Sequence, residues 1–291
     1  MLAELLQFLV SGLTVGAVYA LVALGFTLIY NASDVVNFAQ GEFVMLGGMV
    51  TVFAFAAGMP LPLAAAAAIL VAVGVGLLLH RLAIEPARGA SAVTLIIITI
   101  GASIFLRGIA QIVFDKRFHQ LPAFSGSDPI LLAGAAILPQ SFWVLGGALL
   151  VFAGLFLFLE KTLLGKAVLA TAANRLAARL VGVDTSFVLA LSFGLSAAIG
   201  AFAGILITPI TLTSFDVGTL LALKGFAAAM LGGMGSPLGA VVGGLVLGLL
   251  ESFGAGIISS AYKDAVAFIV ILAVLFVMPQ GLFGRRSVER V

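Results

Sequence analysis

The chain has 291 residues, of which 63% are hydrophobic and 9% are charged, and its formal net charge at pH 7 is +2. Soluble domains carry about 25% charged residues, so this composition excludes an ordinary soluble fold. The small net charge gives no reason to expect nucleic-acid binding, and the lack of cysteine excludes disulfides and thiol catalysis. His80 and His119 stand far apart at the ends of apolar runs, where we expect interfacial residues rather than metal ligands.

Apolar runs follow one another along the whole chain and predict an all-α, polytopic helical bundle. A helix that crosses the membrane needs about 20 mostly apolar residues, and several runs are shorter than that. We therefore expect about eight or nine spans, some of them discontinuous helices, in a single transmembrane domain over residues 1–291. The runs are Leu5–Tyr30, Phe43–Gly58, Leu61–Leu79, Ala92–Phe114, Phe142–Leu159, Phe187–Ile207, Val217–Met234, Leu238–Ile258 and Ala265–Met278.

The basic residues predict which loops face the cytoplasm. They cluster after His80, in 161–185 and in the tail 285–291, and even numbers of runs separate these clusters. Because cytoplasmic loops carry the excess of lysine and arginine, we expect all three clusters in the cytoplasm and the N-terminus outside. The loop 115–140 then lies outside. Its prolines predict an irregular structure that is either a connector or a landing surface for an external protein.

A polar cluster interrupts the apolar sequence between the first two runs. Asn37, Gln40 and Glu42 lie there, with Gly41 to relax the backbone and Asp34 as a candidate N-cap residue. A charge at the bilayer centre costs at least ~2.5 kcal/mol and usually faces a bundle interior or a water-filled path. The favoured interpretation is a translocation path or gate lined by Asn37, Gln40 and Glu42. The alternative is a short hydrated loop whose side chains cap two helices.

The basic segment 161–185 has the pattern of a docking element. Residues 166–181 predict one short helix with an apolar i,i+4 stripe beside its arginines, and Gly182 suits the position after a helix end. Such a helix either rests on anionic headgroups or docks into a groove of a cytoplasmic motor, and we favour docking. The predicted coupling residues are Lys166, Arg175, Leu176, Arg179 and Gly182.

Other charges and small residues have simpler interpretations. Arg107, Lys224 and Glu251 fall in or near apolar runs, where the long basic side chains can snorkel, so a structural role is at least as well supported as a functional one. Small residues four apart, as at Gly12 and Gly16, predict close helix packing. No phosphate-binding glycine loop, Gly-x-Ser-x-Gly elbow or His-Glu-x-x-His is present, so we expect no enzyme and no cofactor or metal.

Nine short segments of the sequence together resemble a known family. Several segments are similar to the LivH-type permease of bacterial branched-chain amino acid ABC transporters, and the match is collinear over essentially the whole chain. These segments are 16–21 (GAVYAL), 25–30 (GFTLIY), 36–43 (VNFAQGEF), 85–88 (EPAR), 99–106 (TIGASIFL), 224–226 (KGF), 231–236 (LGGMGS), 262–264 (YKD) and 278–284 (MPQGLFG).

The resemblance implies a multi-pass permease of the bacterial inner membrane. It implies a second LivM-like permease subunit, two cytoplasmic ATPase subunits and a periplasmic solute-binding protein as partners. Leu169 and Ala173 replace residues usual in the coupling segment of the family, so its contacts there cannot be transferred. The cargo alternatives are urea, short-chain amides and aromatic acids, and the alternative class is an ion-coupled secondary carrier.

Overall fold

The computed structural model describes residues 2–284, and every predicted apolar run forms a helix there. The helices are α1 (Leu2–Ser33), α2 (Gln40–Ala56), α3 (Leu61–Leu79) with the π-helix η1 (His80–Ile84), α4 (Ala92–Phe114), α5 (Pro139–Lys161), α6 (Leu163–Ala173), α7 (Arg175–Leu180), α8 (Thr185–Thr211), α9 (Val217–Gly232), α10 (Pro237–Ile257), the 3-10 turn η2 (Ser260–Tyr262) and α11 (Lys263–Val277). The expectation of a mostly helical bundle is confirmed, and its helices are consistent with a polytopic membrane protein. Six described helices have the length and composition of membrane spans, namely α1, α3 with η1, α4, α5, α8 and α10. The number of actual crossings and the orientation stay predictions.

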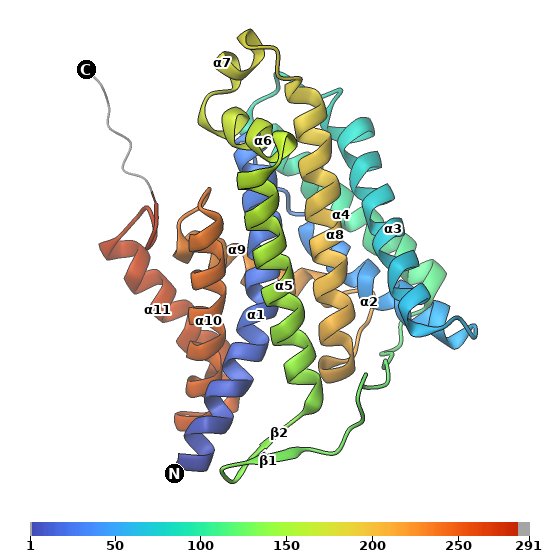
Figure 1. Cartoon of the computed structure of the whole chain (residues 1–291), viewed down its shortest axis with the longest axis vertical. Helices are drawn as coiled ribbons and strands as arrows, with labels where there is room; N and C mark the ends of the chain where they lie inside the picture. The colour runs from blue at the N-terminus through green and yellow to red at the C-terminus, as the bar shows by residue number, and fades with distance from the viewer. Residues whose placement is uncertain (1, 285–291) are drawn as a thin grey trace.

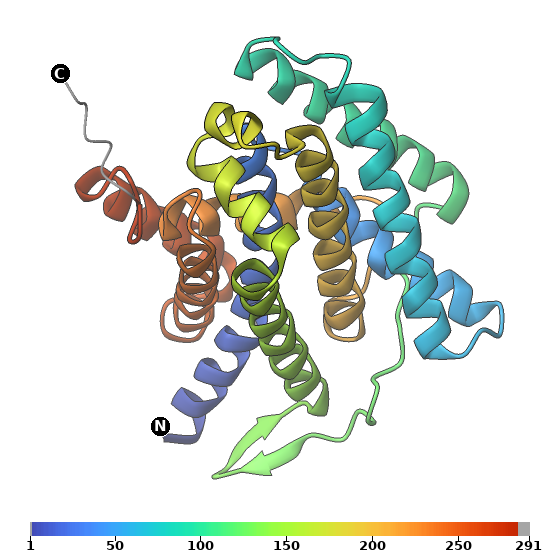
Figure 2. The same cartoon turned by 45° about the horizontal axis from the view of Figure 1, so that its top comes forward.

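Helix α1 forms the centre of the bundle (Figure 1). It contacts α5, α8, α9 and α10 along its length, and its second half is almost completely buried. Helices α10 and α11 lie on one flank and α3 and α4 on the other, as both views show (Figures 1 and 2). An apolar helix buried on all sides by its neighbours is the arrangement that its continuous apolar sequence favours.

Glycines bring α1 and α10 into backbone contact. A Cβ atom on Gly248 would lie 2.3 Å from the Cα of Gly16, and one on Gly244 would lie 2.3 Å from the amide nitrogen of Ala20. No side chain larger than hydrogen fits at either position. The prediction that small residues four apart mediate helix packing is confirmed for these two helices.

The short helices α2 and α9 meet at their first turns. A Cβ atom on Gly41 would lie 1.9 Å from the carbonyl oxygen of Gly218, so only glycine permits this approach. With 17 and 16 residues, α2 and α9 are shorter than a straight span requires. Both helices therefore begin side by side within the bundle, next to the polar segment that precedes α2.

The loop 115–140 contains regular structure, which corrects the prediction of an irregular loop. Strands β1 (Ile130–Leu132) and β2 (Ala135–Ile137) form an antiparallel hairpin. Proline cannot donate to a ladder, but the prolines of this loop lie outside both strands. The hairpin and the start of α1 lie at one end of the molecule, and α6 and α7 lie at the other (Figure 1). The predicted cytoplasmic tail 285–291 lies outside the described residues.

Candidate translocation site

The predicted site residues beside the polar segment between α1 and α2 are enclosed in the bundle, whereas Asp34 at the start of this segment is exposed. The side chains of Asn37, Gln40 and Glu42 are each at most 1% exposed. The chain leaves α1 at Ser33, runs without regular structure to Asn37, turns, and enters α2 at Gln40. Irregular backbone at membrane depth is tolerated only where protein or a water-filled cavity surrounds it. The structure therefore places all three predicted site residues in one buried break between helices.

Asn37 and Gln40 stabilise the segment between α1 and α2 through hydrogen bonds. The Asn37 side-chain oxygen accepts a hydrogen bond from the Ala39 amide at 3.1 Å, which closes a local turn. The Gln40 side chain donates to the Ser196 carbonyl at 3.2 Å and accepts from the Ser196 hydroxyl at 2.5 Å. That hydroxyl also contacts the Gly25 carbonyl at 2.9 Å. Gln40 thus joins α2 to α8 and α1.

Asp34 does not cap α2, which corrects the prediction. Its φ of 59° is left-handed, and its amide donates to the carbonyl of Tyr30 at 2.7 Å, so Asp34 ends α1. Aspartate tolerates this conformation better than most residues because its short polar side chain fits there. Ala39 holds the N-cap position of α2 and contributes no side-chain hydrogen bond. The segment between the helices is therefore longer than a direct capping turn.

Helix α4 faces the break with three polar side chains in a row. Thr99 Oγ1 accepts from the Phe38 amide at 3.2 Å, and Ser103 Oγ donates to Glu42 Oε1 at 2.7 Å. Arg107 Nε lies 3.5 Å from the same Glu42 oxygen. The spacing i, i+4, i+8 puts these side chains on one helix face. This polar stripe is the signal in the sequence that identifies α4 as part of the site, and the sequence analysis missed it.

The contacts of the Glu42–Arg107 pair are incomplete. Glu42 Oε2 is buried and has no hydrogen-bond partner among residues 2–284. The Arg107 side chain is 31% exposed, although it lies about 10 Å from the end of α4 at 1.5 Å rise per residue. The rest of the outer face of α4 is apolar and exposed, as at Ile104, Phe105 and Ile112. A partly exposed guanidinium at this depth requires water or another protein beside it.

A second buried ion pair lies on the other side of α1. Lys224 Nζ is 2.8 Å from Glu251 Oε1 and donates to the Tyr19 hydroxyl at 3.0 Å. That hydroxyl donates to Glu251 Oε2 at 2.7 Å. The three residues come from α9, α10 and α1 and are each at most 8% exposed. Lys224 therefore pairs inside the bundle and does not snorkel to the interface. Of the two roles that its sequence position allowed, this contact favours the structural one.

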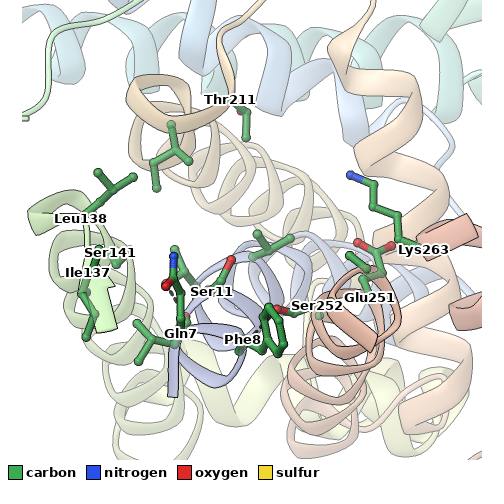
Figure 3. Close-up of a pocket in the computed structure, with 18 of the residues that line it drawn as sticks. Gln7, Phe8, Ser11, Ile137, Leu138, Ser141, Thr211, Glu251, Ser252 and Lys263 are labelled. Atoms are coloured by element: carbon green, nitrogen blue, oxygen red, sulfur yellow. Dashed lines mark hydrogen bonds between the residues drawn. The ribbon is translucent and has the colours of Figure 1, made fainter. Parts of the chain in front are cut away.

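A cavity of about 550 Å³ lies beside this second pair (Figure 3). Glu251 and Tyr19 line it, together with polar residues of α1 such as Gln7 and Ser11. The cavity opens near the hairpin end, because Ala136, Ile137 and Leu138 also line it. The Tyr19–Lys224–Glu251 contacts offset the charge of Glu251 in this wall, and Lys263 of α11 adds a further basic side chain to it (Figure 3).

The coupling segment consists of two helices, which corrects the prediction of one helix over 166–181. Asn174 adopts an extended conformation between α6 and α7, and its side chain accepts from the Ala177 amide at 2.9 Å. Asparagine favours such caps over helix interiors because its side chain binds the free backbone amides. Gly182 has a φ of 90° and follows the end of α7, as predicted. Asp184 caps α8 through the amides of Ser186 and Phe187.

Helix α7 exposes its leucines, and its two arginines lie beside a cavity, with Arg175 partly buried and Arg179 exposed. Leu176, Leu180 and Val181 are 69%, 80% and 79% exposed, and Lys166 on α6 is also exposed. Arg175 and Arg179 instead line a cavity between α7 and the rest of the molecule. Burial, reinforced by the charges of Arg179 and Arg88, lowers the pKa of Arg175 from its ordinary value. The predicted coupling residues therefore divide into two groups that face different directions.

Comparison with protein families gives a match over most of the chain. Residues 8–275 match the family described as the permease component of the branched-chain amino acid transport system. The BraD protein of Pseudomonas aeruginosa, named as a high-affinity branched-chain amino acid transport system permease protein, is 35% identical over 98% of both chains. The LivH protein of Escherichia coli K12, which has the same description, is 34% identical over 98% of this chain and 97% of LivH.

A more distant relative and one solved structure also match. A probable branched-chain amino acid transport permease protein LivH of Methanocaldococcus jannaschii is 30% identical over 91% of this chain and 88% of its own length. The solved structure of PsaBC from Streptococcus pneumoniae in complex with Fab is 17% identical, with a TM-score of 0.48 over 97% of this chain and 93% of that chain.

Proposed function

The chain belongs to the permease family of branched-chain amino acid transport systems, and we propose that it is the membrane subunit of an ATP-driven importer of these amino acids. The cargo reaches it from a periplasmic binding protein. A second, LivM-like permease completes the path through the bacterial inner membrane, and two cytoplasmic ATPase subunits drive the cycle. The names of the relatives and the extent of the match support this proposal.

The observation that carries the proposal is the Glu42–Arg107 pair. Arg107 is partly exposed on a helix whose outer face is otherwise apolar, and Glu42 Oε2 has no described partner. A charge in contact with lipid at this depth is costly. We therefore place the translocation path along α4 and the start of α2, with the second permease subunit covering the same face. Asn37 and Gln40 hold the backbone that presents Glu42, and they line or support the gate.

The ATPases dock on the exposed side of the coupling segment. Leu176 and Leu180 present an apolar surface that fits a groove in the helix-in-groove mode, and Lys166 lies on the adjoining helix. Gly182 ends α7 and directs the chain back into α8. Arg175 and Arg179 line the cavity beneath α7, and Arg179 donates to the Thr185 hydroxyl at the start of α8, so this contact transmits the motion of α7 inward.

The first experiment is uptake of labelled leucine in cells that lack this gene and in cells with the gene restored. We expect restoration to return leucine uptake and unlabelled valine and isoleucine to compete. Competition by urea, short-chain amides or aromatic acids alone would assign one of the alternative cargoes to the same architecture. Uptake that persists after the partner ATPase genes are deleted would contradict the ATP-driven mechanism and favour an ion-coupled carrier.

A further inference from the structure

A second cavity lies at the opposite end of the molecule from the hairpin, among elements that are distant in the sequence. Its volume is about 540 Å³, and it lies between the end of α1, the segment before α4, α7 and the start of α8. Three arginines line it, Arg88, Arg175 and Arg179, together with Asp34. None of these four residues belongs to the Glu42–Arg107 pair or to the apolar surface formed by Leu176 and Leu180.

Three arginines of this cavity face one lining carboxylate, that of Asp34, whose charge acts on Arg175. Arg88 pairs with Glu85 at 3.0 Å and contacts the Ser186 hydroxyl. In the described part of the chain, Arg175 and Arg179 have no acidic partner within 4 Å. Arg179 Nε donates to the Thr185 hydroxyl at 2.8 Å, and Arg175 Nε is buried with no hydrogen-bond partner within residues 2–284. Guanidinium groups held together in this way are suited to bidentate binding of a carboxylate or phosphate.

Asp34 and two helix ends add charge of both signs to the wall of the cavity. Asp34 makes no described hydrogen bond or ion pair through its carboxylate, and it lies where the negative end of the α1 dipole points. Ala90 and Ala92, which also line the cavity, lie at the start of α4, where the dipole end is positive. An ammonium group therefore fits at the Asp34 side and an anionic group at the arginine side.

The remaining wall is aliphatic. Val35, Ile84, Leu95 and Leu189 line the cavity together with the charged residues. A ligand that satisfies all three parts of the cavity carries a carboxylate, an ammonium and a branched aliphatic side chain. Small-molecule sites have this combination of apolar walls and a few placed polar groups, in volumes of about 300–1,000 Å³.

We propose that this cavity is a cytoplasm-facing binding site for the transported amino acid itself, with its carboxylate on Arg175 and Arg179 and its ammonium on Asp34. The proposal rests on the proposed function for the cargo and for the orientation. A bound amino acid would join α7 to the starts of α4 and α8, and so hold the coupling segment against the helix that carries Arg107. Because a ligand stabilises the state that binds it, accumulated product would slow the transport cycle from the inside.

The direct test is equilibrium binding of radiolabelled leucine to the assembled complex without its binding protein. The complex is reconstituted in nanodiscs of phosphatidylcholine, so no anionic lipid competes. We expect saturable binding, and a loss of about tenfold or more in affinity for Asp34→Asn and for Arg175→Gln. Arg81→Gln is the matched control, since it removes a basic residue on the same side that does not line the cavity. All variants are first compared by size-exclusion chromatography.

Analogues separate the two poles of the ligand. Leucinamide lacks the carboxylate and should bind at least about tenfold more weakly than leucine. The keto acid 4-methyl-2-oxopentanoate lacks the ammonium, and Asp34→Asn should bring leucine binding down to the level of this compound. Equal binding of leucine and leucinamide would overturn the assignment of the arginines.

Two further outcomes would overturn the proposal. The first is a complex that binds no leucine but retains phosphatidylglycerol in native mass spectrometry, with the lipid lost in Arg175→Gln; the anionic group would then be a lipid headgroup. The second is leucine binding that Asp34→Asn and Arg175→Gln leave unchanged. Leucine uptake that depends on the gene, combined with either outcome, would leave the proposed function standing and reject only this site. Leucine uptake that is the same with and without the gene would instead contradict the proposed cargo.

Discussion

The two buried ion pairs of this protein lie on opposite sides of α1 and differ in how completely their groups are satisfied. In the Tyr19–Lys224–Glu251 cluster one glutamate oxygen accepts a hydrogen bond from Tyr19, the other lies 2.8 Å from the Lys224 ammonium as an ion pair without a hydrogen bond, and all three side chains are enclosed. In the Glu42–Arg107 pair one glutamate oxygen has no described partner and the arginine is partly exposed. A closed cluster fixes three helices to one another. An open pair leaves binding capacity for a substrate, water or another subunit.

The largest effect should come from breaking the closed cluster. Lys224→Met leaves Glu251 without its cation in an enclosed site, and removing one partner of a buried pair costs about 3–5 kcal/mol. We expect a large loss of folded, monodisperse protein in detergent and a lower unfolding temperature.

The double variant Lys224→Met/Glu251→Gln is the control for this experiment. It removes both charges and should recover most of the stability, because a neutral pair leaves no uncompensated buried charge. If the single and double variants are equally unstable, Lys224 stabilises the protein through packing. That result would contradict an electrostatic role for the Lys224–Glu251 pair.

The next effect concerns the glycine contact beside the closed cluster. Gly248→Ala places a Cβ atom 2.3 Å from the Cα of Gly16, so α10 must move away from α1. Overpacking of this kind costs about 1–3 kcal/mol, which thermal unfolding of the purified protein measures. Gly154→Ala is the matched control, since nothing lies within 4 Å of its added Cβ. Equal unfolding temperatures for the two variants would show that α1 and α10 separate without cost.

The open pair should respond in transport more than in stability. Glu42→Gln keeps the shape of the side chain and removes the charge that Arg107 faces. We expect leucine uptake to fall by about tenfold, equivalent to roughly 1.4 kcal/mol in the barrier, with little change in protein level on immunoblots.

Thr208→Ala is the control for the open pair, because Thr208 is equally buried but donates only to the Gly204 carbonyl of its own helix. It should leave uptake close to that of the wild type. Parallel losses of uptake and protein level in Glu42→Gln would indicate that Glu42 is needed for folding. Both ion pairs would then contribute to stability, and the proposed difference between them would be wrong.

The smallest effect should come from the surface of α7. Leu176→Ser together with Leu180→Ser removes exposed apolar area without touching either ion pair. We expect the ATPase activity stimulated by the loaded binding protein to fall by about fivefold, or roughly 1 kcal/mol of coupling, while basal ATPase activity persists. Unchanged stimulation would contradict docking at this side of the helix.

The sequence predicts the elements well and their contacts poorly. The positions of the helices follow from apolar runs bounded by glycine, proline and polar residues, and Gly182 and Asp184 act as the caps their residue types indicate. The pairing of Lys224 with Tyr19 joins residues 205 positions apart, and no local pattern reports such a distance. The break at Asn174 and the inward direction of Arg175 depend on tertiary packing that competes with the helical pattern.

The close approach of α1 and α10 also bears on how the molecule moves. Two helices that touch through their backbones at Gly16 and Gly248 have no layer of side chains between them that could change rotamers. Sliding or tilting at such a contact would require main-chain atoms to overlap, so the pair must travel as one rigid body. In amide hydrogen exchange during turnover, this pair would behave as the stationary frame. Helix α2 touches α9 through its backbone in the same way at Gly41 and Gly218, so it would belong to this frame. The opening and closing of the protein would then fall to α4 and α7; in α4 nothing lies within 4 Å of a Cβ added at Gly101 or Gly108.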